Sequence, residues 1–464
     1  MISNKKEIID LSNVSIRIVC HACVLITIGK IRILCDPWLM GDVFNNSWSL
    51  QLKSQRLDLL TKEDINSLTH IWISHEHPDH CHFPSLKFLS NQFEDISKIT
   101  VLVKKDIRFM ENIFPELRKL GFKKIKNLNH LEEYKIVDNL SISIFHRRNV
   151  DSALLIFLNK KPIILNINDA VLSNNDCNLI KKRFGNFKIL INQFSIAGFN
   201  GILDERELKK LKDERLKIMI NQHKCLQANV TIPFASFMWF SRQDNRHLNK
   251  WHNSALDVYD FFKREKLNCY CIEPPSEPIL IEKIINKSNK PQHYLKNIEP
   301  EYHDENIHIG KKDLAQLIEK RISELKTYSN SILFSFVEKE FFIFVKDKNW
   351  ILKLISSKSK ITCECLDTPL SKNYPKLVAN LQPLHYAFSN SFGIQTLGIS
   401  GRYFFEGYNK VPKIWKLIRI LSSLDNSKTP LRFSTFFKKS LYEILFNRLD
   451  TLPNQIIQQL KRFF

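Results

Sequence analysis

The chain has 464 residues, of which 44% are hydrophobic and 25% are charged. This composition excludes a disordered chain, and the length predicts two domains rather than one compact core. The formal net charge is +21, with basic residues spread along the whole sequence. Such a charge is explained by a general composition bias, by an anionic substrate or by adhesion to acidic surfaces. Nucleic-acid binding is not expected, because the sequence has no compact basic stripe with interleaved aromatic residues.

The sequence also carries signals about compartment. No apolar run approaches the roughly 18 residues of a membrane span, and the segment MISNKKEIID lacks the apolar stretch of a secretory signal. Most of the cysteines fall in apolar, strand-like stretches, and the spacing of Cys269 and Cys271 puts both thiols on one strand face. We therefore expect reduced, buried thiols and a cytoplasmic protein.

The first part of the chain predicts a layered α/β domain. Alternating residues predict a β-hairpin whose arms are 15–28 and 31–35, with Gly29-Lys30 as the turn. A helix over 58–67 leads to an apolar strand over 69–74. Further strands are expected at 100–103, 140–145, 153–158, 162–167, 188–192 and 229–237, and helices at 107–120, 174–183 and 204–227.

A second, smaller α+β domain is expected beyond a Pro-rich and then Lys/Asn-rich passage at 274–290. We place the boundary so that the domains are 1–290 and 291–464. The second has a predicted helix at 311–327 and strands at 332–337, 341–345, 350–355, 360–365 and 393–403. The basic amphipathic tail, 433–464, is expected to dock on its own domain; peripheral contact with an anionic membrane is the alternative.

The strongest chemical signal is the row SHEHPDH, directly after the strand at 69–74. Its potential metal ligands are His75, His77, Asp79 and His80. Divalent cations take imidazole nitrogens and carboxylate oxygens at about 2 Å, and a loop at a strand's end can aim several side chains at one point. The pattern predicts one or two divalent ions, with His75 and His77 facing one and Asp79 and His80 the other.

This row resembles the metal loop of the metallo-β-lactamase superfamily, and the resemblance covers residues 12–275. His21 in CHACVLI is similar to the element that opens many members, and Asp36-Pro37-Trp38-Leu39 is similar to their Asp-Pro-Trp motif. The resemblance implies an αββα sandwich and one or two zinc or iron ions. It further implies that Asp36 supports the metal loop through hydrogen bonds, with Trp38 near the mouth of the site.

Two later ligands follow from the same resemblance. His146, after the strand at 140–145, stands where the family has the third histidine of the first metal, and Asp169 stands where it has its bridging aspartate. The family's final histidine is missing, because VTIPFASF has Phe234 and Ala235 at that place. The second metal is then weaker, absent, or completed by another histidine: His82, His223, His247 or His252.

CDPWLMGDVFNNSW together with TIPFASF is similar to the metallo-β-lactamase-type domain of CMP-N-acetylneuraminate hydroxylases. Those proteins also bear a Rieske iron–sulfur domain, whose Cys-x-His and Cys-x-x-His pairs do not occur in this sequence. FFIFVKDKNWILKL followed by FGIQTLGISGRYF resembles sterol-carrier-like domains, which implies an apolar cavity or a dimer contact. A plain packing domain is the alternative for residues 291–464.

Three functions remain open. The first is a metal-dependent hydrolase that activates water to hydroxide at a small, anionic ester, lactone or phosphodiester, with Asp169 holding the hydroxide and Asp79 taking the proton. The second is a CMP-N-acetylneuraminate hydroxylase-like non-haem iron oxygenase that takes electrons from a separate protein. The third is a binding protein with a relict metal site. Asn245 and Asn249, beside Arg242 and Arg246, are candidate contacts to an anionic substrate.

Overall fold

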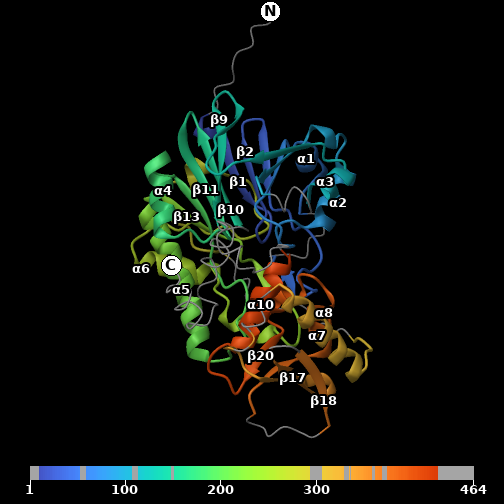
Figure 1. Cartoon of the computed structure of the whole chain (residues 1–464). Coiled ribbons are helices and arrows are strands. Elements are labelled where there is room, and N and C mark those ends of the chain that lie inside the picture. The colour runs from blue at the N-terminus through green and yellow to red at the C-terminus, as the bar shows by residue number, and fades with distance from the viewer. Residues whose placement is uncertain are drawn as a thin grey trace, which may run out of the picture.

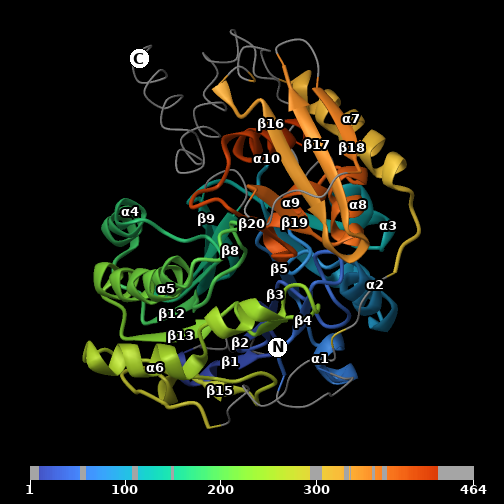
Figure 2. The same ribbon diagram turned by 90° about the horizontal axis from the view of Figure 1, so that it is seen from below.

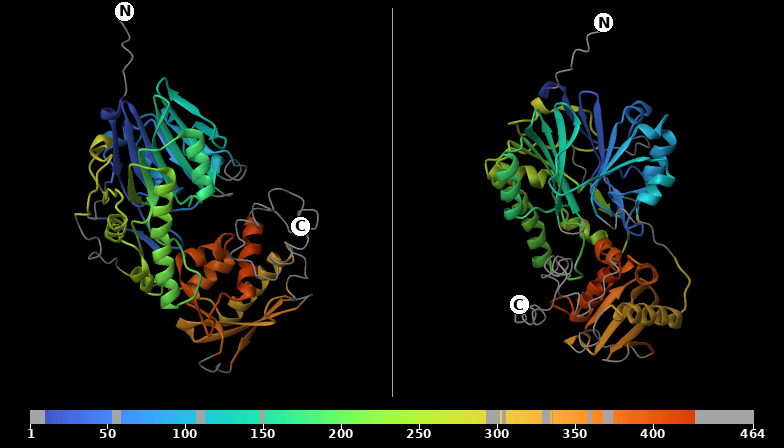
Figure 3. Two further views of the ribbon diagram at one scale, coloured as in Figure 1. Left: turned by 90° about the vertical axis from the view of Figure 1, so that its left-hand side faces the viewer. Right: turned by 45° about the horizontal axis from the view of Figure 1, so that its top comes forward.

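The computed structural model describes residues 10–52, 59–106, 113–147, 151–292, 302, 306–328, 334, 336–357, 361–367 and 374–426. Two β-sheets face each other in the N-terminal part, and helices cover their outer faces (Figure 1). A second unit, which we define as the described residues 306–426, lies against one end of this sandwich (Figure 3).

The first sheet has the strand order β15-β1-β2-β3-β5-β6-β7. Its antiparallel part joins β15, β1, β2 and β3, and its parallel part runs from β3 through β5 and β6 to β7. The strands are β1 (Val14–Ile18), β2 (Val24–Ile28), β3 (Ile31–Cys35), β5 (His70–Ile73), β6 (Thr100–Lys104), β7 (Lys124–Leu128) and β15 (Ile279–Leu280).

The predicted hairpin arm over 15–28 is wrong. The chain turns between β1 and β2, where the backbone N–H groups of Val19 and Cys20 both donate to the carbonyl of Cys23. The turn therefore places His21 at the end of the sheet. In an unbroken strand, His21 would instead have paired with a residue of the neighbouring strand.

The second sheet has the order β13-β12-β11-β10-β9-β8 and changes from antiparallel to parallel pairing at β11. Its strands are β8 (Tyr134–Val137), β9 (Leu140–Arg147), β10 (Asp151–Leu158), β11 (Lys161–Asn168), β12 (Ile189–Gln193) and β13 (Val230–Phe234). All these strands except β8 are largely buried, because one face packs on the first sheet and the other on helices.

Three apolar layers make the sandwich. The central layer lies between the sheets and includes Ile26 and Leu154, while separate outer clusters join each sheet to its helices. The helices are α1 (Lys62–Asn66), α2 (Phe83–Gln92) and α3 (Phe114–Lys119) on the first sheet, and α4 (Asn174–Phe184), α5 (Glu205–Leu226) and α6 (Ala255–Arg264) on the second (Figure 2). The αββα architecture expected from the sequence is confirmed.

The second unit has a core of its own, built on a five-stranded sheet of order β18-β17-β16-β19-β20. Its strands are β16 (Glu340–Val345), β17 (Trp350–Ser356), β18 (Ile361–Leu366), β19 (Lys376–Ala379) and β20 (Tyr403–Glu406). Its helices are α7 (Lys311–Lys326), α8 (Leu381–Ser389), α9 (Gly393–Ser400) and α10 (Lys413–Asn426). A two-stranded sheet, β4 (Trp48–Leu50) with β14 (Met238–Phe240), lies in the first part of the chain.

The predicted strand at 393–403 is wrong, because its first eight residues form the buried helix α9. The apolar run lacks the alternation of a half-buried strand, and a buried helix and a buried strand look alike in such a run. The tail at 433–464 and much of the strand predicted at 332–337 lie outside the described residues. The domain boundary at 290 and the likeness to sterol carriers stay predictions. Among the residues described, no helix combines the length and hydrophobicity that crossing a bilayer requires.

Candidate metal centre

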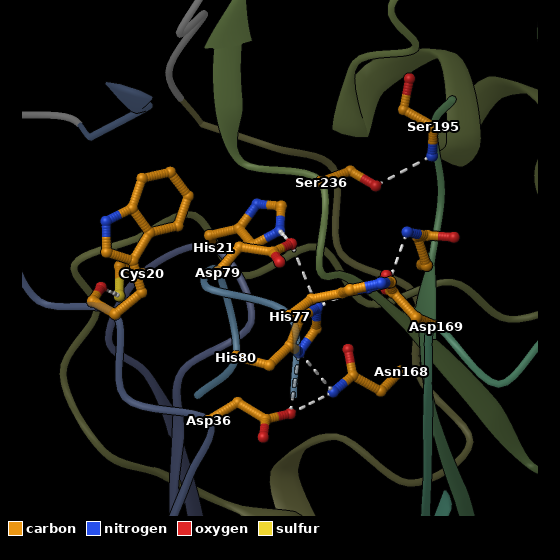
Figure 4. A network of polar contacts seen from close by, with 12 residues as sticks. Cys20, His21, Asp36, His77, Asp79, His80, Asn168, Asp169, Ser195 and Ser236 are labelled. Atoms are coloured by element: carbon orange, nitrogen blue, oxygen red, sulfur yellow. Dashed lines mark hydrogen bonds and ion pairs between the residues drawn. The ribbon is translucent and has the colours of Figure 1, made fainter. Parts of the chain in front are cut away.

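Strands from both sheets end at one place, and their ends carry the polar side chains of the centre (Figure 4). The histidine loop begins at Ser74, directly after β5, and Asn168 and Asp169 lie at the end of β11. Ser152 of β10 donates to the carbonyl of Ser74 at 2.6 Å, which ties the second sheet to the start of the loop. Parallel strands thus deliver their carboxyl ends to a common edge, as open α/β sheets do for ligand sites.

Asp36 holds this loop in place from the end of β3. Its Oδ1 accepts from the backbone N–H of Ser74 at 2.7 Å, and its Oδ2 lies 3.0 Å from His80 Nδ1. The amide of Asn168 donates to the same carboxylate. Because a carboxylate can only accept, His80 carries its proton on Nδ1 and turns Nε2 toward the centre. These contacts fit a supporting role for Asp36, which stays a prediction.

A first group of donors consists of His21, Asp79 and His80. Asp79 Oδ2 lies 3.5 Å from His21 Nε2 and 3.2 Å from His80 Nε2. All three residues are at most 2% exposed. Both nitrogens of His21, Oδ1 of Asp79 and Nε2 of His80 are buried without a hydrogen-bond partner. Since buried polar atoms are ordinarily paired, Asp79 Oδ1, His80 Nε2 and one of the two nitrogens of His21 fit a cation held between them.

A second group consists of His75, His80 and Asp169. His80 Nε2 lies 3.4 Å from Asp169 Oδ2, and the rings of His75 and His80 are 4.1 Å apart between centroids. Within each of the two groups the candidate ligand atoms lie within 4.8 Å of one another. Gln193, at the end of β12, donates to Asp169 Oδ1 at 2.7 Å and so leaves Oδ2 toward the centre.

The charges of the centre favour a cation. Burial by itself lowers the pKa of His80, but the carboxylates of Asp79, Asp169 and Asp36 outweigh burial and hold that pKa well above its usual value. Burial raises the pKa of Asp79, yet His80 and His21 hold it well below the usual value. Carboxylates that stay ionised in a buried place need positive charge beside them, which a metal ion supplies.

His77 and Asp151 complete the surroundings of His75. His75 Nε2 lies 2.8 Å from His77 Nδ1 and 3.9 Å from Asp151 Oδ1. Burial raises the pKa of Asp151 to about 6. Asp151 begins β10, which pairs with β9 in a register that sets Ser152 opposite His146. Sequence reasoning missed Asp151, although an acidic residue at the start of a strand beside the expected third histidine was the available signal.

His146, which the sequence predicts as the third histidine ligand, lies in neither group. Its Nε2 lies 3.0 Å from the carbonyl oxygen of Leu128. Its backbone N–H donates to His130 Nδ1 at 3.0 Å. The ring is therefore turned to the edge of β7, and Asp151 is the side chain that reaches His75 from this side.

Asn245 and Asn249 hold loops together, which corrects the expectation that they contact a substrate. Asn245 Nδ2 donates to the carbonyls of Ser47 and Ser400, and its Oδ1 accepts from the N–H of Arg242. Asn249 exchanges two hydrogen bonds of 2.9 Å with the backbone of Phe240. Both amides thus make hydrogen bonds within the protein.

The aromatic residue expected near the mouth, Trp38, is buried beside the first group. Its ring lies 5.4 Å from that of His21 between centroids, and its Nε1 donates to the carbonyl of Gly41. Trp48 is also close, with its centroid 6.3 Å from His21. His21 is thus a potential metal ligand that lies against apolar rings, whereas the sequence predicted only a supporting role for it.

No residue replaces the final histidine in the part of the chain that the structure describes. Phe234 and Ala235 are buried, and neither candidate group includes His82, His223, His247 or His252. His82 caps α2 through Ser85, and His223 lies 2.8 Å from Thr231 Oγ1. Two further residues were missed: Gln193, and the buried Arg215, whose Nε donates to the Gln193 carbonyl. Nothing in their local sequence distinguishes them from other polar residues.

One family model and several curated proteins match parts of this chain. The family model described as "Beta-lactamase superfamily domain" matches residues 15–151. A cytidine monophosphate-N-acetylneuraminic acid hydroxylase of Danio rerio is 25% identical over 271 residues, covering 55% of this chain and 44% of that protein. The Mus musculus protein of the same name is 38% identical over 92 residues, 19% of this chain and 15% of the relative.

Each match thus spans less than half of the curated relative. Among solved structures, CmlA, a diiron β-hydroxylase from Streptomyces venezuelae, is similar with a TM-score of 0.42 at 14% identity, over 58% of this chain and 54% of that one. The family match over residues 15–151, the αββα sandwich and the histidine loop at its edge make the N-terminal part of this chain similar to the metallo-β-lactamase superfamily.

Proposed function

We propose that the protein is a non-haem iron enzyme that hydroxylates a small anionic substrate with dioxygen. One observation carries the proposal: each of the two candidate groups, which share His80 and are therefore alternatives for its Nε2, consists of two imidazoles and one carboxylate. This is the ligand set by which non-haem iron is held with open positions, and iron held in this way supplies the binding and reduction of dioxygen. The relatives named as hydroxylases support the same choice.

The protein's own residues supply orientation and a dry environment. His21, Asp79 and His80 would hold one ion, and His75, His77, Asp151 and Asp169 surround the neighbouring position. Asp36 fixes the ring of His80, and Gln193 fixes Asp169. The buried rings of Trp38 and Trp48 exclude water from the side of His21. Asp169, whose side chain is 16% exposed, is placed to pass protons between the centre and the outside.

The proposed reaction balances as R–H + O₂ + 2 e⁻ + 2 H⁺ → R–OH + H₂O. Its two electrons need a donor. We assign the electrons to an iron–sulfur protein.

Hydrolysis is the second candidate, and the same Asp169 favours it. A zinc ion held there would supply acidic water, whose pKa such an ion lowers toward about 7, and the partly exposed carboxylate of Asp169 would be placed to take a proton. Against this, the three aspartates and the missing final histidine give a site richer in oxygen donors than the histidine-dominated zinc sites. A binding protein with a relict metal site is the third candidate.

The test is to purify the protein after growth with iron or with zinc and to measure metal content, oxygen uptake and product together. With iron, reduced ferredoxin and CMP-N-acetylneuraminic acid, we expect oxygen uptake that matches a hydroxylated product. Anaerobic turnover of a phosphodiester or lactone by the zinc form would instead establish the hydrolase. Less than one metal per chain after reconstitution, with a His80→Ala variant no different, would leave only the binding protein.

A further inference from the structure

We propose that the second unit positions an aromatic wall of the candidate metal centre, and that Gln382 and Arg402 are its positioning residues. The wall is the turn at residues 43–48, which we call the aromatic turn. The inference rests on the proposed function only in taking the histidine cluster as the reaction centre; the contacts themselves are structural.

The aromatic turn borders the centre through two rings. The ring centroid of Phe44 lies 6.2 Å from that of His77, and the centroid of Trp48 lies 6.3 Å from that of His21. Phe44 and Trp48 also stack edge to face at 4.7 Å. A shift of this turn would therefore change what can approach both His77 and His21.

The backbone of the turn is one that the chain does not adopt readily by itself. Phe44, Asn45 and Asn46 are consecutive non-glycine residues with φ of 53°, 59° and 52°. Left-handed backbone is unfavourable for L-residues other than glycine, and for Phe44 more than for the asparagines. Such a conformation persists where surrounding contacts impose it. The turn's own contacts include the hydrogen bonds between the backbones of Val43, Ser47 and Trp48 and the one from Ser47 Oγ to the Asn45 carbonyl. From the first part of the chain, Arg242 Nε also donates to the Asn46 carbonyl.

The second unit supplies further contacts through a reciprocal amide pair. Asn45 Nδ2 donates to Gln382 Oε1 at 2.9 Å, and Gln382 Nε2 donates back to Asn45 Oδ1 at 3.0 Å. Gln382 lies in the first turn of α8 and is 9% exposed. Two parallel bonds between planar amides fix both distance and orientation, so they fix the middle of the turn to α8.

Arg402 holds the side chain of Gln382 in place. Its Nη1 donates to Gln382 Oε1 at 2.7 Å, while its Nε lies 2.9 and 3.0 Å from the two carboxylate oxygens of Asp244. Arg402 is 3% exposed. Because buried charged hydrogen bonds are strong and directional, this arginine joins the second unit to the loop that follows β14.

Apolar contacts follow the same path. Ile399 and Phe404 of the second unit pack against the buried cluster that contains Trp38, Phe44 and Trp48. The second unit therefore contacts the aromatic turn through both polar and apolar groups, and its place at the end of the sandwich is visible in Figure 3. A packing domain remote from the centre would not need to contact this turn.

The test compares Gln382→Ala with Gln395→Ala by hydrogen exchange of the peptide that covers residues 43–50 in the purified full chain. Gln395 is a matched control, because its amide bonds to Ser422 and Ser423 within the second unit. We expect at least tenfold faster exchange of this peptide in Gln382→Ala, unchanged exchange in Gln395→Ala, and unchanged exchange of the peptide covering β10 in both variants. Equal exchange of residues 43–50 in the two variants overturns the proposal.

A second variant guards against a general loss of folding. Asn45→Asp keeps a residue that tolerates left-handed backbone but loses the donor to Gln382 Oε1. It should increase exchange of the same peptide. Its effect should not add to that of Gln382→Ala, because both variants remove the same amide pair. Full additivity of the two effects contradicts the proposal. Exchange needs no substrate, so this result stands or falls apart from the reaction. If turnover is found, Gln382→Ala should raise KM more than it lowers kcat.

Discussion

Asp36 is the residue on which the histidine loop depends. Its carboxylate accepts from Ser74, His80 and Asn168. Asp36→Asn keeps one acceptor but puts an amide donor against donors of His80 or Asn168. We expect metal affinity to fall about 10–100-fold, the usual cost of losing such a support. Titration of the apoprotein with iron or zinc measures this fall; Asp257→Asn, at the capping box of α6, is the control and should bind like the unaltered protein.

Asp151 and His146 give opposite predictions. Asp151 Oδ1 lies 3.9 Å from His75 Nε2, whereas His146 turns its ring to the Leu128 carbonyl. Asp151→Asn should lower the bound metal per chain, and His146→Ala should leave it unchanged, as measured by elemental analysis after dialysis. Metal loss in His146→Ala alone would show that His146 turns inward when an ion binds.

At the scale of residues, the sequence predicted the potential ligands that are close together in the chain and missed those that are far apart. His75, His77, Asp79 and His80 lie within six consecutive residues, so one loop suffices to bring them together. His21 and Asp151 reach the cluster through a turn and a register that no short motif encodes. Asn245 and Asn249 were misassigned because side-chain amides that hold loops and those that bind ligands look alike in a sequence.

At the scale of elements, the glycine after α9 is a sensitive contact. Gly401 has φ +67°, and a Cβ there would lie 2.3 Å from Leu248 Cδ1. Gly41 has φ +64° but nothing within 4 Å of such a Cβ. Gly401→Ala should therefore lower the free energy of unfolding by about 1–3 kcal/mol more than Gly41→Ala, since it adds a clash to the same backbone cost. Urea unfolding of both variants measures the difference; equal losses would mean that Leu248 moves aside freely.

Elements with a clear period were predicted well, and elements set by packing were not. The strands β5, β6, β9 and β11 and the helices α4 and α5 fall within a few residues of their predicted ranges. The break between β1 and β2 depends on a turn closed by the Cys23 carbonyl. The turn lies inside an apolar run whose pattern predicts one continuous strand. Helix α9 is buried on most of its surface, which removes the amphipathic period that identifies a helix.

For the whole molecule, buried neutral histidines set the response to acid. Burial lowers the pKa of His70 and His223 to about 4 and that of His252 to about 3. The unfolded chain takes up protons at about pH 6.5, where these folded histidines do not. Stability should thus be complete above about pH 6.5 and be lost as the pH falls toward 4, by on the order of 1–3 kcal/mol for each histidine.

His223→Gln tests this response away from the metal centre. His223 is buried against Thr231, whereas His308 is exposed and serves as the control position. The free energy of unfolding in urea should fall less between pH 7 and pH 4.5 in His223→Gln than in the unaltered protein or in His308→Gln. An identical fall in all three would assign acid sensitivity to other groups.

Two residues that support the centre share an unusual backbone: Asp36 has φ 42° and Asn168 has φ 50°. Asparagine and aspartate are the side-chain-bearing residues that accept this conformation most readily. A saturation library at these two positions, sorted only for soluble folded protein, should already return little besides aspartate, asparagine and glycine. The backbone conformation alone would then favour the residue types that the site uses, without any selection for catalysis.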